Sequence, residues 1–441
     1  MTFLKHLNQT DRAVLGRELH NLAADLFPIC RSITGNGVRE TLGRIKSRIP
    51  LHTFEVPTGT QVFDWTVPKE WNIRDAYIAD AGGTRVVDFQ KCNLHVMNYS
   101  VPVHETMTLG KLKPRLFTIP EHPDWIPYRT SYYKEDWGFC LSHRQMLELE
   151  DCEYEVSIDA TLEDGQLTYG ECYLAGRSTD EVLISCHACH PSLANDNLSG
   201  LVVATALAKL LTGQDLRHSY RFLFIPGTIG AVTWLARNRE TVGRIRHGLV
   251  LTCIGDAGGF HYKKSRRGDA EIDRAAAHVL SHCGEAAETL EFSPYGYDER
   301  QYCSPGFNLP VGCLMRSVWG SFPEYHTSAD NLEFIQPLAL AGSLLACAGI
   351  LDVLENNRCY RNELPYCEPQ LGRRGLYRST GGEAGGEDIM ARLWVLNLSD
   401  SHHSLLDIAE QSGISFPILS EAAELLCQKG LLSVLSREGE I

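Results

Sequence analysis

Histidine and carboxylate side chains gather in three stretches of the sequence, and residues of these types could hold a metal ion. The first stretch, SCHACHPSLANDNLSG at residues 185–200, contains His187 and Asp196. The second is PYGYDERQYCSPGFNLP at residues 294–310, and the third is GSFPEYHTSADNLEF at residues 320–334. Imidazole and carboxylate groups are ligands that Zn²⁺ uses in hydrolytic sites, where an open coordination position makes a water acidic. These stretches therefore suggest a metal-dependent hydrolytic site.

The second and third stretches add acidic, basic and aromatic side chains that could surround such a site. Glu299 and Glu324 are candidates for proton transfer or for recognition of an amino group, because of their position in these loops. Asp298, Arg300 and Tyr325 are candidates for substrate contact. Arg300 could bind a substrate carboxylate or could pair with Asp298, and the sequence leaves both possibilities open.

Most of these residues also have a purely structural explanation. The single CxxC at residues 186–189 is weak evidence for a redox or zinc motif, because no second pair accompanies it. His187 could be a buried, hydrogen-bonded imidazole, Asp196 a helix cap, and His326 a surface residue. Asp330 could orient a histidine or cap the helix that follows it. The metal hypothesis therefore depends on whether the fold brings these side chains together.

Short apolar runs separated by helical patterns predict the elements that would position them. The predicted strands are EVLISC, YRFLFIP, GLVLTCI and PVGCLM, at residues 181–186, 220–226, 248–254 and 310–315. Buried strands that alternate with amphipathic helices predict an α/β domain with a mostly parallel sheet flanked by helices. Ligands bind such sheets beyond the carboxyl ends of the strands. The first stretch lies at such an end, directly after EVLISC.

Changes in composition predict two further domains. Residues 58–149 have short alternating runs and many turn signals, which indicate a β-rich domain inserted between residues 1–57 and residues 150–370. After a linker at residues 373–388, residues 387–441 resemble a winged helix-turn-helix. That tail has nine acidic and three basic side chains, so phosphates would be repelled. We expect it to bind a protein partner or to mediate self-association, and we do not expect nucleic-acid binding.

Overall composition favours a cytoplasmic protein that does not bind a membrane. The 441-residue chain has a formal net charge of −14, and its first residues do not resemble a secretory signal. Fifteen cysteines in such a chain suggest reduced thiols. The longest apolar stretch, residues 338–354, contains Gly342, Ser343 and Asp352 and is expected to be a buried helix.

The motifs resemble the co-catalytic zinc aminopeptidase family. NDNLSG after a histidine at a strand end, with YHTSAD near the end of the α/β domain, is similar to the metal-binding segments of that family. The family includes bacterial leucyl aminopeptidases, aminopeptidase Y and, as a one-zinc relative, glutaminyl cyclase. WTVPKEW, the DERQY and SPGFNLP segments, and EYHTSADN resemble a bacterial group with an inserted β domain and a C-terminal winged helix. The resemblance covers nearly the whole chain.

The resemblance implies roles for individual residues. It makes His187 the first imidazole ligand, Asp196 the carboxylate that bridges two metals, and His326 the last ligand. It also places the 294–310 stretch at the substrate pocket, where Asp298 keeps an acid of the family and Glu299 replaces its histidine.

Several positions depart from the family pattern. Family peptidases have two glutamates after the second strand, a general base and a metal ligand, where this chain has Gly227 and Thr228. The aspartate of the third strand maps near Thr252, with Asp256 as a possible substitute, and Cys189 replaces an aspartate that supports the first histidine. Because one aspartate cannot offset the charge of two ions, we expect one zinc ion per chain.

These observations lead to two hypotheses. The first is a zinc-dependent hydrolase that cleaves an amide bond in a small peptide or an amino-acylated metabolite. The second is a catalytically weakened binding or regulatory protein of the same fold, which the loss of carboxylates at Gly227 and Thr228 favours. A transcription factor acting through the tail is a third option, which the acidity of the tail disfavours.

Overall fold

An eight-stranded sheet forms the centre of the computed structural model, which describes residue 7 and residues 10–376 and 386–435. Its central strands run parallel in the order β12, β11, β13, β16. They are β12 (Ser219–Ile225), β11 (Glu181–His187), β13 (Ile245–Leu251) and β16 (Val311–Met315). Helices cover these strands, which explains why each reads as a nearly continuous apolar run. The predicted α/β fold with a mostly parallel sheet is confirmed.

Strands of other directions complete the two edges of this sheet. On one side β12 pairs antiparallel with β10, and β10 with β1; on the other, β16 pairs antiparallel with β14. The four outer strands are β1 (His52–Pro57), β10 (Gln166–Leu174), β14 (Phe260–Lys263) and β15 (Ala287–Leu290). The sheet is therefore mixed, with a parallel centre that ends where a ligand site is expected.

Helices of the α/β part pack on the sheet and on each other. They are α2 (Arg12–Leu26), α3 (Asn36–Lys46), η3 (Ala194–Ser199), α6 (Gly200–Leu211), α7 (Ile229–Arg237), η4 (Val242–Arg244), α8 (Glu271–Ser281), α9 (Glu299–Tyr302) and α10 (Pro337–Asn356), whereas the short helix η5 (Gly372–Arg374) lies in the C-terminal part. The helix α10 is long and apolar enough to span a membrane, but it packs against α2, α6 and α8 and most of its apolar window is buried. It is the buried core helix that residues 338–354 predict.

A separate antiparallel sheet lies between β1 and β10 in the chain. Its strand order is β5, β4, β9, β6, and it extends to Glu163, beyond the expected boundary at residue 149. The elements of this segment are β2 (Gln61–Val62), β3 (Trp65–Thr66), β4 (Glu70–Ala79), β5 (Arg85–Asp88), η1 (Asn93–His95), β6 (Val103–Thr108), α4 (Leu109–Leu112), η2 (Lys113–Arg115), β7 (Leu116–Phe117), β8 (Phe139–Cys140), α5 (His143–Leu147) and β9 (Glu153–Glu163). The side chains of β9 alternate between buried and half-buried positions, unlike those of the fully buried central strands β11 and β12.

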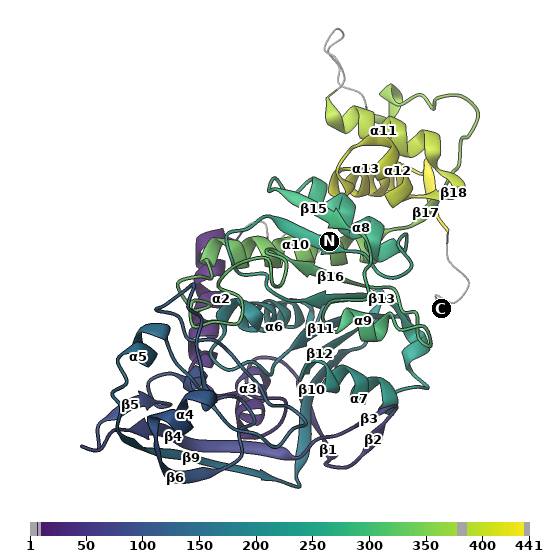
Figure 1. Ribbon diagram of the computed structural model, residues 1–441. Helices are drawn as coiled ribbons and strands as arrows, with labels where there is room; N and C mark the ends of the chain where they lie inside the picture. The colour runs from purple at the N-terminus through teal and green to yellow at the C-terminus, as the bar shows by residue number, and fades with distance from the viewer. Residues whose placement is uncertain (1–6, 8–9, 377–385, 436–441) are drawn as a thin grey trace.

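The C-terminal part has the helices and strands of a winged helix. These are β17 (Cys359–Asn362), α11 (Glu387–Leu398), β18 (Asp400–Ser404), α12 (Leu405–Ser412), α13 (Phe416–Gln428) and β19 (Leu432–Val434). Because β17 pairs with both β18 and β19, this unit begins before residue 387. Residues 377–385 of the expected linker lie outside the described residues. In Figure 1 the winged helix and the sheet β5-β4-β9-β6 lie at opposite ends of the molecule.

Candidate metal centre

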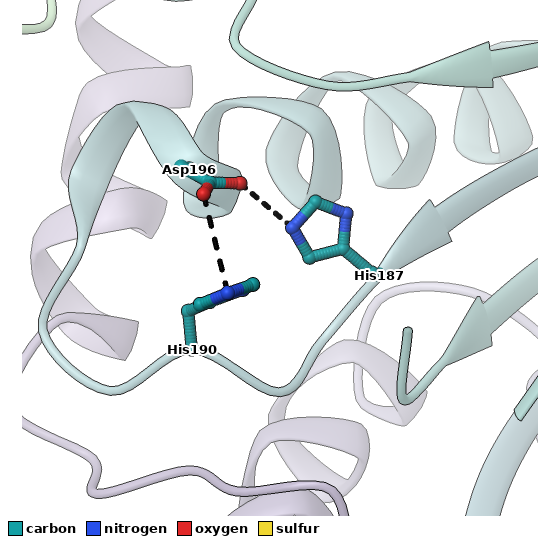
Figure 2. A group of neighbouring side chains, drawn as sticks. All are labelled: His187, His190 and Asp196. Carbon is teal, nitrogen blue, oxygen red and sulfur yellow. Dashed lines mark hydrogen bonds and ion pairs between the residues drawn. The ribbon is translucent and has the colours of Figure 1, made fainter. Parts of the chain in front are cut away.

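Three histidine side chains converge on the carboxylate of Asp196. His187 Nε2 lies 2.8 Å from Asp196 Oδ1, and His326 Nε2 lies 3.0 Å from Oδ2. His190 Nε2 lies 4.0 Å from the same Oδ2 atom. Figure 2 shows that His187 and His190 face different oxygens of the Asp196 carboxylate. Ligand atoms of His187, His190 and Asp196 all lie within 4.8 Å of one another. The spacing is suitable for a metal ion held between them.

The strands and loops of the α/β part determine this geometry. His187 is the last residue of β11, so its side chain projects at the carboxyl edge of the sheet. The loop that follows turns back and presents Asp196, whose backbone N–H donates to the carboxylate of Asp330 at 2.9 Å. The N–H of Asn195 donates to the other oxygen of Asp330 at 2.5 Å. Asp330 thus fixes the loop that carries Asp196 through backbone hydrogen bonds, which is neither of the two roles considered for it above, orienting a histidine or capping the following helix.

The electrostatics of the cluster favour the protonation states that a metal requires. Burial lowers the pKa of His187 and, more strongly, that of His190. Burial alone would raise the pKa of Asp196, but His190, His187 and His326 outweigh it and hold that pKa well below its usual range. At neutral pH the cluster therefore offers uncharged imidazoles at His187 and His190 and one carboxylate at Asp196, a donor set that fits a divalent ion.

His190 is a member of the cluster to which the sequence gave no role. It lies three residues beyond the end of β11, in an irregular loop, where no periodicity predicts the direction of a side chain. His190 directly follows the CxxC at residues 186–189, and this position could have signalled a metal ligand. The two cysteines, however, do not form a metal site together with it. Cys186 is buried in the core, and Cys189 Sγ lies 3.7 Å from the carbonyl oxygen of Gly227.

The segment between β7 and β8 covers one side of the cluster. Tyr128 lies with its ring centroid 5.1 Å from those of both His190 and His326. Its backbone N–H donates to the carbonyl oxygen of His326 at 2.8 Å, and its hydroxyl lies 2.8 Å from that of Tyr132. Only the His326 side chain, about 35% exposed, connects the cluster to solvent, whereas His187, His190 and Asp196 are buried. A ligand must therefore approach from the His326 side.

Glu299 does not join this cluster, contrary to the catalytic role expected for it. Its carboxylate is buried, accepts a hydrogen bond from Lys263 Nζ at 2.7 Å, and accepts another from the N–H of Tyr297 at 3.0 Å. Protonation would break a buried ion pair, so this group is poorly suited to act as a base. The partner Lys263 comes from β14, and nothing in the local sequence indicates that pairing.

The neighbours of Glu299 have a different environment. Asp298 is buried, and within the described ranges neither of its oxygens has a hydrogen-bond partner. Burial, with a smaller contribution from Glu299, raises the pKa of Asp298 to about 8. Arg300 is half-buried, and its Nε also has no hydrogen-bond partner within those ranges. Both side chains remain candidates for substrate contact.

The third stretch places two further candidates beside His326. Tyr325 stacks on the His326 ring, with centroids 4.0 Å apart and an interplanar angle of 14°. Glu324 is half-buried, and no hydrogen bond or ion pair of its carboxylate occurs in the part of the chain that the structure describes. Tyr325 thus lies on the side from which a ligand can approach, and Glu324 precedes it in the chain.

The end of β12 lacks the carboxylates of a peptidase, and an aromatic ring fills the space. A Cβ atom on Gly227 would lie 2.6 Å from Cε1 of Tyr297 and 3.1 Å from the Cβ of His187. The ring of Tyr297 stacks on His187, with centroids 3.7 Å apart. Asp256, considered as a substitute ligand, instead accepts hydrogen bonds from Asn195 Nδ2 and Ser317 Oγ, both at 2.7 Å.

Comparison with known families agrees with this architecture. A family model described as a domain of unknown function, DUF4910, matches residues 20–357. The chain belongs to the DUF4910 family. A winged helix-turn-helix model matches residues 358–434, which agrees with the early start of that unit at β17.

Relatives of this DUF4910 chain are aminopeptidase-like. A Clostridium acetobutylicum protein, named for polysaccharide biosynthesis and an aminopeptidase-like domain, is 54% identical over 95% of this chain and 97% of its own length. A crystal structure from the same species, named as a peptidase, has a TM-score of 0.93 at 52% identity over 98% of this chain and 99% of its own. The zinc aminopeptidase of Bacillus subtilis has a TM-score of 0.56 at 13% identity, covering 77% of this chain and 94% of that one. The last similarity establishes the aminopeptidase fold and nothing finer.

Proposed function

We propose that this protein is a zinc-dependent hydrolase that holds one ion per chain and cleaves an amide bond in a small peptide or an amino-acylated metabolite. The observation that carries the proposal is the convergence of His187, His190 and His326 on Asp196 at the carboxyl edge of the sheet. A bound zinc ion would polarise the scissile carbonyl and lower the pKa of a water molecule. The aminopeptidase fold of the chain supports the same reaction class.

The residues around the cluster would bind and orient the substrate. Tyr325 stacks on His326 at the approach, and we propose that the carboxylate of its neighbour Glu324 accepts a proton or binds a substrate amino group there. Because the approach passes one half-exposed histidine beside the covering ring of Tyr128, a small substrate fits better than a folded polypeptide. Because the Clostridium relative is named for polysaccharide biosynthesis, we include sugars among the amino-acylated metabolites to be tested.

A second candidate is a binding protein that retains the ion but has weak hydrolytic activity. Tyr297 favours it, because its ring occupies the space beside Gly227 where a glutamate side chain would start. In both candidate functions the protein binds the ion. They differ in whether a nearby group accepts a proton efficiently during hydrolysis. Removal of a general base typically costs a factor of about 10²–10⁴ in rate.

The winged helix is proposed to bind protein and not nucleic acid. The N–H of Phe416, the first residue of α13, donates to His278 Nε2 on α8 at 3.1 Å, and Arg274 of α8 forms ion pairs with Asp407 and Glu410. The second helix of the helix-turn-helix therefore begins against the α/β part. We further propose that the protein acts in the cytoplasm.

Metal analysis followed by a substrate panel tests the proposal. The protein, stripped of metal and reconstituted with zinc, is expected to retain about one ion per chain after desalting. Aminoacyl-anilides, dipeptides and amino-acylated sugars are then compared with and without zinc. Zinc-dependent release of an amine supports the hydrolase, and a bound ion without turnover on any class supports the binding protein. Failure to retain zinc or any first-row divalent ion would contradict both.

A further inference from the structure

Asn197 determines which ring nitrogen of His187 can carry a proton. Oδ1 of Asn197 accepts from the N–H of Gly200 at 3.1 Å, which orients the amide group. The Nδ2 atom then lies 2.9 Å from the carbonyl oxygen of Leu251 and 3.2 Å from Nδ1 of His187. A side-chain NH₂ group has two protons and accepts no hydrogen bond. Nδ1 of His187 must therefore be the acceptor in this contact.

This contact makes His187 a hydrogen-bond donor toward Asp196. A neutral imidazole carries one N–H, so if Nδ1 accepts, the proton is on Nε2 and is donated to Asp196 Oδ1 over 2.8 Å. Metal binding through Nε2 would require a lone pair there and would move the proton to Nδ1, against the NH₂ of Asn197. The stacked ring of Tyr297, at an interplanar angle of 19°, holds the imidazole in this orientation.

The other two imidazoles have no such restriction. Nδ1 of His190 lies 3.5 Å from the hydroxyl of Tyr297 and 3.8 Å from Sγ of Cys189, and both groups can accept its proton. Its Nε2 is then free to offer a lone pair on the Oδ2 side of Asp196. His326 approaches the same oxygen, and across the described residues no hydrogen bond fixes its Nδ1.

We propose that His190, His326 and Oδ2 of Asp196 hold the ion, whereas His187 is a positioning residue that fixes the carboxylate through Oδ1. The inference rests on the proposed function, because it requires an ion at Asp196. It gives three protein ligands and one open position, the arrangement of catalytic zinc sites. It also explains why one ion suffices, since Oδ1 is already engaged by an N–H group.

Nuclear magnetic resonance of the full-length protein, labelled with ¹⁵N-histidine, tests this directly. In the metal-free protein, the His187 signals, assigned by their loss in His187→Gln, are expected to show a protonated Nε2 and an unprotonated Nδ1. After loading with ¹¹³Cd²⁺, cadmium–nitrogen coupling is expected at two histidines, absent in His190→Ala and His326→Ala respectively. Coupling at His187, or a protonated Nδ1 there, overturns the inference.

Metal affinity of the same variants provides the second measurement. Gln at position 187 can keep an N–H near Asp196 Oδ1, so zinc affinity should fall by no more than about 10-fold, the lower end for a partner that does not touch the metal. His190→Ala and His326→Ala should lose more than about 100-fold, beyond the range for such partners. Equal losses in all three variants contradict the division of roles. If the wild type binds no ion, the proposed function fails, while the metal-free spectrum still decides the role of His187.

Discussion

The two sides of the candidate centre differ in what each retains of a hydrolytic site. On the Asp196 side, which comprises Asp196 and the three histidines around it, the charged group has imidazole partners. On the Gly227 side, which comprises Gly227, Thr228 and Tyr297, an aromatic ring occupies the space of a carboxylate. The residues that could bind an ion and the position where a base would be expected therefore lie at the ends of different strands, β11 and β12.

The largest expected effect comes from removing the charge on the Asp196 side. Asp196→Asn should abolish zinc retention, because a neutral amide cannot offset the charge of the ion and all three imidazoles face this group. Equilibrium dialysis against zinc measures the loss. Asp256→Asn is a matched control, since that carboxyl is also buried in a nearby loop but bonds to Asn195 and Ser317. Comparable loss in both variants would mean that the loops, and not the charge, determine binding.

The next effect restores a base on the Gly227 side. Gly227→Glu alone should yield a destabilised protein without improved hydrolysis, because its Cβ would lie 2.6 Å from the Tyr297 ring. Gly227→Glu combined with Tyr297→Gly creates the space, and hydrolysis of the best substrate should then rise by at least about 10²-fold. Steady-state kinetics with zinc measures the gain.

Tyr297→Gly alone is the control for that double variant. It opens the space without supplying a carboxylate, so it should not increase turnover. An equal gain in the single Tyr297 variant would show that access, and not the missing base, limits the reaction. High wild-type activity would instead mean that another group, with Glu324 the first candidate, already accepts the proton.

Sequence reasoning predicted the fold because apolar runs mark its strands. It predicted part of the Asp196 side because ligands bind where such strands end. A short apolar run located β11, and a histidine at its end must project at the carboxyl edge of a parallel sheet. His326 and Asp196 followed from motif resemblance, and the structure brings both together with His187. His190 was missed because its direction depends on the path of an irregular loop, which no local pattern specifies.

The Gly227 side was harder to predict because it depends on compensation between distant residues. The sequence indicated the absence of a carboxylate at Gly227, but not that Tyr297 fills the space. Likewise Glu299 looked available in its loop, whereas Lys263, a partner 36 positions earlier in the chain, neutralises it. Such pairs become visible only when the packing of β14, α9 and the intervening loop is known.

A moderate effect is expected from Asp298, the neighbour of Tyr297 in the chain. Its folded pKa of about 8 lies above the ordinary value of 3.8, so the unfolded chain releases this proton first as the pH rises. The native state therefore loses stability between about pH 4 and pH 8, by at most about 1.4 kcal/mol per pH unit. Asp298→Asn should remove this loss, and urea unfolding of both proteins at pH 5 and pH 8 measures it. Parallel pH profiles would contradict the raised pKa.

The smallest effect concerns the hydroxyl pair that holds Tyr128 over the Asp196 side. Tyr128→Phe should lower the free energy of unfolding by about 1–3 kcal/mol, because the hydroxyl of Tyr132 loses its partner, and Tyr132→Phe should act similarly. The double variant should recover most of this loss, since no unpaired hydroxyl remains. Zinc affinity should stay unchanged in all three, because the ring against His190 and His326 is preserved. A double-mutant cycle measured by urea unfolding tests the loss and recovery of stability, and zinc titrations of the same variants test the affinity. Weaker zinc binding in the Phe variants would mean that the hydroxyl pair, and not ring packing, maintains the Asp196 side.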